Sequence, residues 1–183
     1  MTPTVDSGSR LDRWLSAAAA IGAICAVAIA LYQAALAREQ QRASAWPYLS
    51  QSNNYVTGQP YRRLLENQGI GPARVRNFQV RVDDKPAHSW SEAVSTLTGQ
   101  PDSGLIYSSL GRGSVLPPGA TLELLRVPPG DQARRFWLAA QTRLATVACY
   151  CSVYNECWNA DSRADEPVPV RACVDDSAAN FSR

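Results

Sequence analysis

Residues 15–36 read LSAAAAIGAICAVAIALYQAAL and contain no charged side chain. As an α-helix, this stretch would be about 33 Å long, which is enough to cross the hydrocarbon core of a bilayer. Trp14 and Tyr32 would then lie about 27 Å apart along the helix, near the two membrane interfaces where aromatic side chains are favoured. The sequence therefore predicts a single transmembrane helix over residues 14–37.

The segments on either side of this helix are polar. Residues 1–13 carry a proline, a glycine and charges of both signs, and we expect a disordered tail there. Residues 38–45 can continue the helix as a polar stalk, which a Trp-Pro pair ends because the residue before proline avoids helical angles. Residues 46–174 have the length of one domain with its own core, and we expect a second disordered tail over 175–183.

A cleaved signal peptide is the alternative interpretation of the apolar stretch. Ala35-Leu36-Ala37 has the small-x-small form of a cleavage site, and basic residues precede the stretch. However, the stretch is longer than the usual apolar core of a signal peptide, and Tyr32 and Gln33 interrupt its end. We therefore expect a retained signal-anchor.

Along one face of the predicted helix, every fourth residue has a small side chain or none: Ala18, Gly22, Ala26 and Ala30. Small residues at this spacing let two transmembrane helices pack closely, so a homodimer through this face is a candidate interaction, beside another protein partner. Such a ribbon also arises by chance in an alanine-rich helix, which leaves the alternative of no self-association open.

The predicted domain consists of short apolar strands between turns rich in proline, glycine and asparagine. We expect strands at residues 61–66, 74–82, 105–110, 121–127, 144–153 and 167–173, a loop at 51–60, and short helices at 89–97 and 131–141. Within the second strand, Phe78, Val80 and Val82 alternate with polar residues. Val75 is out of phase with them, which predicts a β-bulge near Asn77.

A glycine-rich motif, Asn67-x-Gly69-x-Gly71-Pro72-Ala73, lies between the first two strands. It resembles the start of immunoglobulin-like β-sandwich modules in bacterial envelope proteins, and the chain resembles uncharacterised bacterial single-pass membrane proteins with such a domain. The resemblance implies a mainly β fold, in which an N-terminal transmembrane α-helix precedes an immunoglobulin-like β-sandwich with two short helices. A phosphate-binding loop would need a helix after the motif, whereas a strand follows, so we interpret the motif as a structural turn.

Four cysteines cluster late in the chain, at Cys149, Cys151, Cys157 and Cys173. An even number of clustered cysteines in an exported domain is typical of disulfide bonds. Four cysteines permit three connectivities, and the spacing does not choose among them. We favour Cys151–Cys157 across a hairpin, with Cys149–Cys173 holding the last strand.

Zinc binding and redox catalysis are the competing interpretations of these cysteines. A zinc site made of four cysteines usually contains pairs two to four residues apart, and the C-x-C and C-x5-C spacings fit that poorly. An active dithiol is expected as C-x-x-C at the start of a helix, and that motif is absent from the sequence. Disulfide bonds are therefore the favoured interpretation.

The flanking charges do not orient the helix, since Arg10 and Arg13 precede it and Arg38 and Arg42 follow it. The expected disulfides orient it instead, because they persist in oxidising compartments. We therefore expect a bacterial inner-membrane protein with its N-terminus in the cytoplasm and its C-terminal domain in the periplasm. A bacterial source also accounts for abundant alanine and for Lys85 being the only lysine.

No residue pattern indicates catalysis or nucleic-acid binding. The net charge is +2, with 18 basic and 16 acidic residues, so no strong field favours nucleic acid. The sequence contains no nucleophile elbow, zinc-protease motif or Walker loop. His88, the only histidine, reads as a surface turn residue. The remaining candidates are acidic and lack the order of a calcium loop: Asp161, Asp165, Glu166, Asp175 and Asp176.

These observations support one hypothesis, that the chain is a membrane-anchored, non-catalytic binding or scaffolding protein of the bacterial cell envelope. It would need no cofactor and no metal. One alternative is a cytoplasm-facing sensor or effector domain with a four-cysteine zinc site on a membrane anchor. The other is an enzyme with no recognisable motif.

Overall fold

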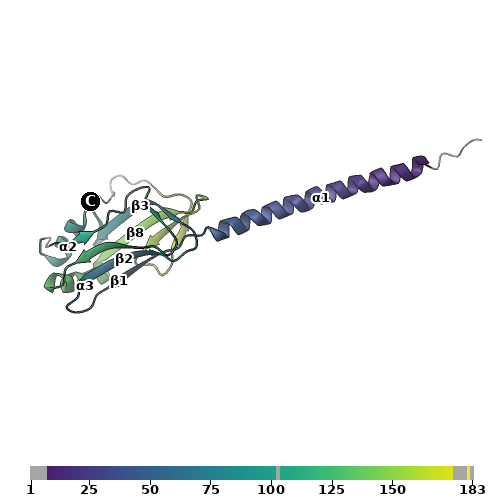
Figure 1. Cartoon of the computed structure of the whole chain (residues 1–183). Coiled ribbons are helices and arrows are strands. Elements are labelled where there is room, and N and C mark those ends of the chain that lie inside the picture. The colour runs from purple at the N-terminus through teal and green to yellow at the C-terminus, as the bar shows by residue number, and fades with distance from the viewer. Residues whose placement is uncertain (1–7, 102–103, 175–180, 182–183) are drawn as a thin grey trace, which may run out of the picture. The chain divides into compact units, whose positions relative to one another are not determined.

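A computed structural model of the chain describes residues 8–101, 104–174 and 181. The chain divides into two units, Met1–Ala43 and Ser44–Arg183. Nearly all of helix α1 (Gly8–Ser44) belongs to the first unit, and the second is a body of strands with two further helices (Figure 1).

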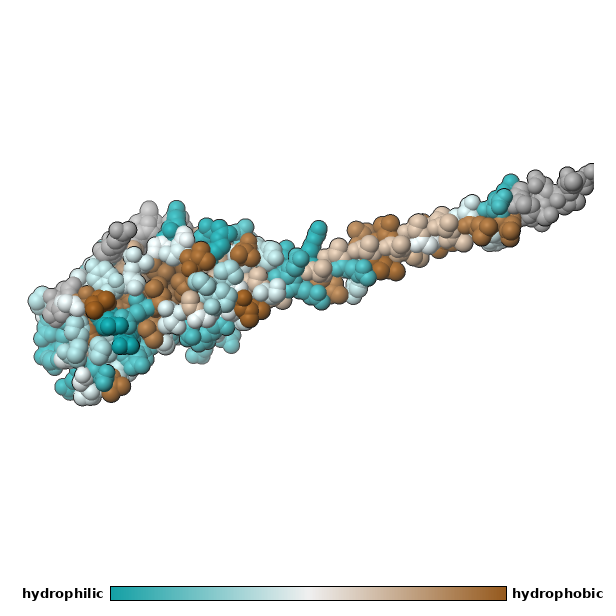
Figure 2. Space-filling model, in the orientation of Figure 1, coloured by the Kyte–Doolittle hydropathy of each residue, from teal (hydrophilic) through white to brown (hydrophobic). Residues whose placement is uncertain are grey.

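Helix α1 contains the predicted membrane span. Its residues Leu11–Ser44 form a helix that is long and apolar enough to cross a membrane. Hydrophobic residues occupy the middle of the helix and hydrophilic residues its ends (Figure 2). Large apolar side chains such as Ile24 and Leu31 are 70% and 68% exposed, which is unfavourable in water.

Helix α1 starts earlier than predicted and ends as predicted. Residues 8–13, which we expected to be disordered, belong to the helix. No helix breaker follows Gly8, so the helix extends from the apolar stretch back into these residues. The expected polar stalk is helical as far as Ser44, and the helix stops just before the Trp-Pro pair. Residues 1–7 lie outside the described part of the chain.

The second unit is built on two antiparallel sheets. The first has the strand order β1 (Leu49–Asn54), β2 (Tyr61–Asn67), β7 (Thr121–Val127), β5 (Ile106–Tyr107). The second has the order β10 (Val168–Val170), β9 (Cys157–Asp161), β8 (Leu144–Cys151), β3 (Ala73–Val82), β4 (Lys85–Ala87), and β6 (Val115–Leu116) also pairs with β3. This confirms a mainly β body with short helices, while the immunoglobulin-like topology stays a prediction.

The predicted strands are present, with two main differences. Residues 105–110 contain only the two-residue strand β5. Residues 51–54, which we placed in a loop, belong to β1 and pair with β2. The side chains of Ser52, Asn53 and Asn54 are polar and exposed, so this edge strand depends on backbone hydrogen bonds that its residue pattern does not reveal.

The predicted bulge in β3 is present. The pairing between β3 and β8 shifts register between Val75 and Asn77, so no residue of β8 is paired with Arg76. A two-residue turn, Asp83-Asp84, then joins β3 to β4. Both turn residues have positive φ, as a tight hairpin of this kind requires.

Helices α2 (Trp90–Thr98) and α3 (Asp131–Arg143) lie together at one end of the sheets (Figure 1). Ser89 caps α2 by accepting a hydrogen bond from the backbone N–H of Glu92, at 3.1 Å. Helix α3 begins at Asp131, and the chain enters it at Gly130 without a side-chain cap.

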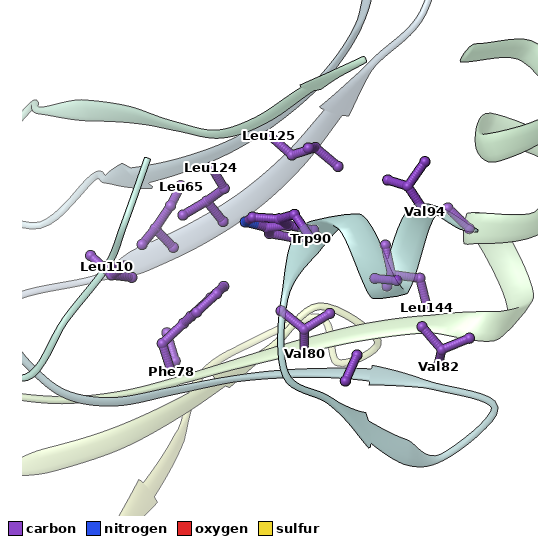
Figure 3. Close-up of a cluster of buried hydrophobic side chains, with 14 of the residues drawn as sticks. Leu65, Phe78, Val80, Val82, Trp90, Val94, Leu110, Leu124, Leu125 and Leu144 are labelled. Carbon is purple, nitrogen blue, oxygen red and sulfur yellow. The ribbon is translucent and has the colours of Figure 1, made fainter. Parts of the chain in front are cut away.

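The core lies between the two sheets and helix α2 (Figure 3). Leu65 and Leu124 from the first sheet face Phe78 and Val80 from the second. Trp90, at the start of α2, is 1% exposed and lies between these groups. Helix α2 therefore closes one end of the core with its first side chain.

Phe181 packs against this core from the C-terminal end of the chain. Its ring centroid lies 5.8 Å from that of Phe78 and 5.2 Å from that of Trp90. This position corrects the expectation of a disordered tail for Phe181. The rest of that expectation concerns residues 175–180 and 182–183, which lie outside the described part of the chain, and Val174 is the last residue described before them.

Candidate functional site

Two disulfide bonds join the end of β8 to its neighbours. Cys149 and Cys151 lie two residues apart on β8, so their side chains share one face. Cys151 bonds to Cys157, which lies directly opposite it at the start of β9, with 4.0 Å between the Cα atoms. Cys149 bonds to Cys173, with 5.7 Å between the Cα atoms. These are the two pairs that we favoured from the sequence.

The two disulfides are in direct contact. The Sγ atoms of Cys151 and Cys173 lie 3.8 Å apart, although each is bonded to a different partner. The sulfurs of Cys151, Cys157 and Cys173 all lie within 4.8 Å of one another. The arrangement therefore brings sulfurs of both disulfides together at one end of the second sheet.

A pocket of about 410 Å³ opens over this sulfur cluster. The described residues that line it are Arg76, Arg112, Cys151, Asn155, Cys157, Arg171, Ala172, Cys173 and Val174. Three of them are arginines, and none of them is acidic. We call this the arginine–disulfide pocket.

Three segments that are far apart in the sequence supply its arginines. Arg76 is the unpaired residue of the β3 bulge, and a bulge redirects a side chain away from the regular alternation. Arg112 lies in a turn that is held beside the bulge, because the N–H of Gly113 donates to the carbonyl of Val75 at 3.0 Å. Arg171 precedes Cys173, whose disulfide ties this segment to β8.

A second pocket, of about 210 Å³, adjoins the first. It shares Arg76 and Arg112 with the arginine–disulfide pocket, and its other described lining residues are Asn77, Phe78, Leu110, Gly111 and Phe181. Asn77 lines the second pocket and Val174 lines the first, and the side-chain amide of Asn77 donates a hydrogen bond to the carbonyl of Val174 at 3.2 Å. The second pocket therefore adds aromatic and aliphatic side chains to the two arginines that it shares with the first.

The chemistry of the sulfurs depends on their oxidation state. In the disulfide-bonded form they are not thiolates and cannot ligate zinc, which requires the deprotonated thiol. Once one disulfide is opened, the contact between Cys151 and Cys173 permits thiol–disulfide exchange within the cluster. Basic groups such as the neighbouring guanidiniums stabilise a thiolate, so they favour such exchange.

The other predicted candidates do not form a site in the described part of the chain. His88 is exposed in the turn before α2, and its backbone N–H donates to the carboxylate of Glu92. Asp161, Asp165 and Glu166 line one small pocket of about 90 Å³, but among the described residues their carboxylates do not form a group close enough to hold a metal ion. Asp161 also accepts a hydrogen bond from the backbone of Arg163. Asp175 and Asp176 lie outside the described residues.

The small-residue face of α1 is open. Ala18, Gly22, Ala26 and Ala30 are exposed on the helix, and no atom lies within 4 Å of a Cβ built on Gly22. Helix packing through this face stays a prediction.

A buried arginine, which we did not predict from the sequence, links the two sheets. Arg63 on β2 is 2% exposed. Its Nη2 donates to Oγ1 of Thr146 on β8 at 2.6 Å, and its Nη1 donates to Oδ1 of Asn53 on β1 at 2.9 Å. Strand alternation carried the signal, because Tyr61 and Leu65 face the core and Arg63 lies between them on the same side.

Asn67 ends β2 on the same inward side and is 0% exposed. Its Oδ1 accepts from the N–H groups of Tyr48 and Gly69, at 3.2 and 3.1 Å. Its Nδ2 donates to the carbonyls of Gly71 and Leu116, at 2.8 and 3.0 Å. One side chain therefore joins three separate backbone segments.

The two glycines of the motif are required by close backbone contacts. A Cβ on Gly69 would lie 2.5 Å from the carbonyl oxygen of Trp46, and one on Gly71 would lie 2.0 Å from that of Ala45. These contacts leave no room for a side chain, and they agree with the interpretation of the motif as a structural turn.

Comparisons of the chain with protein families, curated proteins and solved structures found no match. The likeness to immunoglobulin-like envelope modules therefore stays an expectation from the motif at residues 67–73.

Proposed function

We propose that the chain is a single-pass, membrane-anchored, non-catalytic binding or scaffolding protein of the bacterial cell envelope. Helix α1 would act as a retained signal-anchor in the inner membrane, with the N-terminus in the cytoplasm and the disulfide-bonded body in the periplasm. The observation that carries the proposal is the combination, in one chain, of an exposed apolar helix and a body closed by two disulfides.

The membrane part of the proposal rests on solvation. Apolar side chains along α1, such as Ile21 at 63%, are exposed, and each would gain roughly 1.5–3 kcal/mol on transfer from water to an apolar environment. The backbone of a helix satisfies its own hydrogen bonds, so lipid can surround it without cost to the peptide groups. The two disulfides support the periplasmic compartment, because disulfide bonds persist outside a reducing cytoplasm.

The binding role rests on the arginine–disulfide pocket. Its described lining residues include neither a histidine nor a carboxylate, so they supply no general base at neutral pH. They do supply three guanidinium groups, which are well suited to binding. The immunoglobulin-like sandwich and a homodimer through the small face of α1 remain parts of this proposal, supported by two antiparallel sheets and by the small-residue spacing.

Reporter fusions test the topology. In a Gram-negative host, a C-terminal alkaline phosphatase fusion should be active and a C-terminal green fluorescent protein fusion dark, because the first needs the periplasm and the second fails to mature there. The full chain should stay in the membrane pellet after alkaline carbonate extraction. An intact mass that corresponds to a chain starting at Arg38 would instead show a cleaved signal peptide. An inactive phosphatase fusion with a fluorescent green fluorescent protein fusion would contradict the proposed orientation.

The zinc-sensor alternative has one structural observation in its favour, the three sulfurs that lie within 4.8 Å of one another. Metal analysis and thiol counting on the chain, purified without reductant, separate the two. Protein without bound zinc and with only Cys25 free supports the disulfide-bonded binding module. One zinc per chain, with the four late cysteines reduced, would support the cytoplasm-facing sensor.

A further inference from the structure

Two arginines of the arginine–disulfide pocket, Arg76 and Arg171, carry charges that the described residues around them do not neutralise. The side chains of Arg76 and Arg171 form no hydrogen bond or ion pair with any residue in the described part of the chain. Other arginines of the body are paired, for example Arg143 with Asp83 at 2.6 Å. Arg76 and Arg171 are like charges that no described carboxylate offsets, so they repel one another and favour an anion between them.

The number and origin of the arginines indicate what kind of anion fits. Arg76, Arg112 and Arg171 approach the pocket from a strand bulge, a turn and the segment after β10. A carboxylate offers two oxygens, whereas a phosphate monoester offers three acceptor oxygens and a charge of about −1.5 to −2 at neutral pH. One guanidinium group can donate two parallel hydrogen bonds to two oxygens of the same anion. A site lined by three guanidinium groups therefore suits a phosphate monoester better than a carboxylate.

The adjoining pocket indicates the rest of the ligand. Arg76 and Arg112 line both pockets, so a phosphate held by them lies at the boundary of the second one. Phe181, which is half-buried, offers aromatic surface to that pocket, beside the buried side chains of Phe78 and Leu110. An apolar group attached to the phosphate could therefore be removed from water there.

We propose that the arginine–disulfide pocket binds a phosphate monoester whose apolar group enters the adjoining pocket. This inference rests on the proposed binding role and names its ligand class. The volume of about 410 Å³ is within the usual range for small-ligand sites. The ester can be a soluble organophosphate or the headgroup of an anionic lipid, which share this chemistry.

The test uses the full chain in a zwitterionic detergent, with phenyl phosphate as the probe and calorimetry as the readout. The double variant Arg76→Gln, Arg171→Gln should raise the Kd by roughly tenfold or more, because each guanidinium supplies a charge-assisted hydrogen bond. The matched control is Arg134→Gln, Arg135→Gln, which makes the same change in net charge at exposed positions on α3. Circular dichroism and a thiol count check that both variants are folded and disulfide-bonded.

Three further ligands sharpen the result. Inorganic phosphate should bind more weakly than phenyl phosphate because it lacks the apolar group, and benzoate should also bind more weakly because it lacks the third oxygen. Benzyl alcohol should not bind. No binding of phenyl phosphate, equal losses in both double variants, or equal affinities for inorganic and phenyl phosphate would each overturn the proposal.

Vesicles identify the source of the phosphate. Displacement of phenyl phosphate by phosphatidylcholine vesicles that contain phosphatidic acid, but not by pure phosphatidylcholine, assigns the site to a lipid headgroup. Failure of both vesicles to displace a probe that binds assigns it to a soluble ester. The topology and extraction tests of the proposed function do not involve the pocket. A failure of the pocket to bind phosphate and a failure of the membrane proposal can therefore be told apart.

Discussion

The Sγ atom of Cys151 lies 3.8 Å from that of Cys173, yet Cys151 is bonded to Cys157 and Cys173 to Cys149. Each disulfide therefore has a sulfur of the other as a near neighbour. Cys151 therefore has two cysteines within reach, its bonded partner Cys157 and the neighbouring Cys173.

Replacing Cys157 should allow a disulfide bond to form between Cys151 and Cys173. In Cys157→Ser, Cys151 becomes a free thiol beside Cys173, so its thiolate can attack the Cys149–Cys173 bond and release Cys149. We expect a mixture of Cys149–Cys173 and Cys151–Cys173, measured by mass spectrometry of peptides alkylated at pH 8 without reductant. In the control Cys173→Ser, the Cys151–Cys157 bond should persist. A single Cys149–Cys173 species in Cys157→Ser would contradict the prediction.

Loss of the Asn67 side chain should strongly destabilise the body. Asn67→Ala removes four hydrogen bonds at a position that is 0% exposed and leaves backbone groups of Tyr48, Gly69 and Leu116 without that partner. We expect the free energy of unfolding to fall by about 2–4 kcal/mol, measured by urea unfolding with tryptophan fluorescence. Asn54→Ala, at an exposed position on β1, should change it by less than about 0.5 kcal/mol.

Arg63 should be replaceable by an apolar side chain of similar length. Its charge is buried, and no described carboxylate pairs with it. In Arg63→Met, Thr146 keeps its hydrogen bond to Gln51 and Asn53 keeps that from Tyr61, so no neutral partner is orphaned. We therefore expect a change within about 1 kcal/mol, or a gain in stability.

Arg63→Ala provides the contrast, because it leaves a cavity. It should cost about 2–4 kcal/mol in the same urea titration. An equally large loss in Arg63→Met would show that the charge itself stabilises the sheets. The methionine variant should also raise the pKa of Tyr61 further, since burial already raises it and the Arg63 charge opposes that effect.

Tyr150 should make the body sensitive to alkali. Burial raises the pKa of Tyr150 to about 12, above an unfolded value of 10.0. The folded state therefore holds the phenol proton more tightly, so this contribution to stability is complete below pH 10 and is lost as the pH rises towards about 12. Urea midpoints at increasing pH should fall over this interval.

Tyr150→Phe separates this effect from general alkaline unfolding. The variant loses the hydroxyl that accepts a hydrogen bond from the N–H of Leu49 at 3.2 Å, so it should be less stable at neutral pH. Its stability should nevertheless fall less steeply between pH 10 and 12. Parallel slopes for the two proteins would show that Tyr150 is not the titrating group. Tyr61, whose pKa is also raised by burial, leaves a residual slope.

Much of the local structure could be predicted from residue patterns. The strand at 121–127 and the cap at Ser89 follow from alternation and from capping chemistry, and the bulge follows from the phase slip beside Asn77. The edge strand β1 could not be predicted, because its outer half is polar and is held by backbone pairing with β2 and by hydrogen bonds from Tyr61 and Arg63 to Asn53. The buried position of Arg63 was visible in the alternation of β2, but the residue type argued against it.

Only the cysteines of the candidate site, and not its arginines, could be predicted from the sequence. The cysteines could be identified as disulfide partners from their number and spacing, but their spacing did not decide the connectivity. Arg76, Arg112 and Arg171 are 36 and 59 residues apart in the sequence, and no local pattern connects them. They meet because a bulge, a pinned turn and a disulfide place them around one pocket.

Residue patterns are therefore enough for the local features: an apolar helix long enough for a membrane, strands set by alternation, and cysteines near enough to pair. Features that depend on distant segments come from the packing of the whole body. This packing selected which cysteines are bonded, buried Arg63 between two sheets, and gathered three arginines over the sulfur cluster. The physical reason is that side-chain periodicity acts within one element, whereas a pocket forms from elements whose approach is set by packing of the whole core.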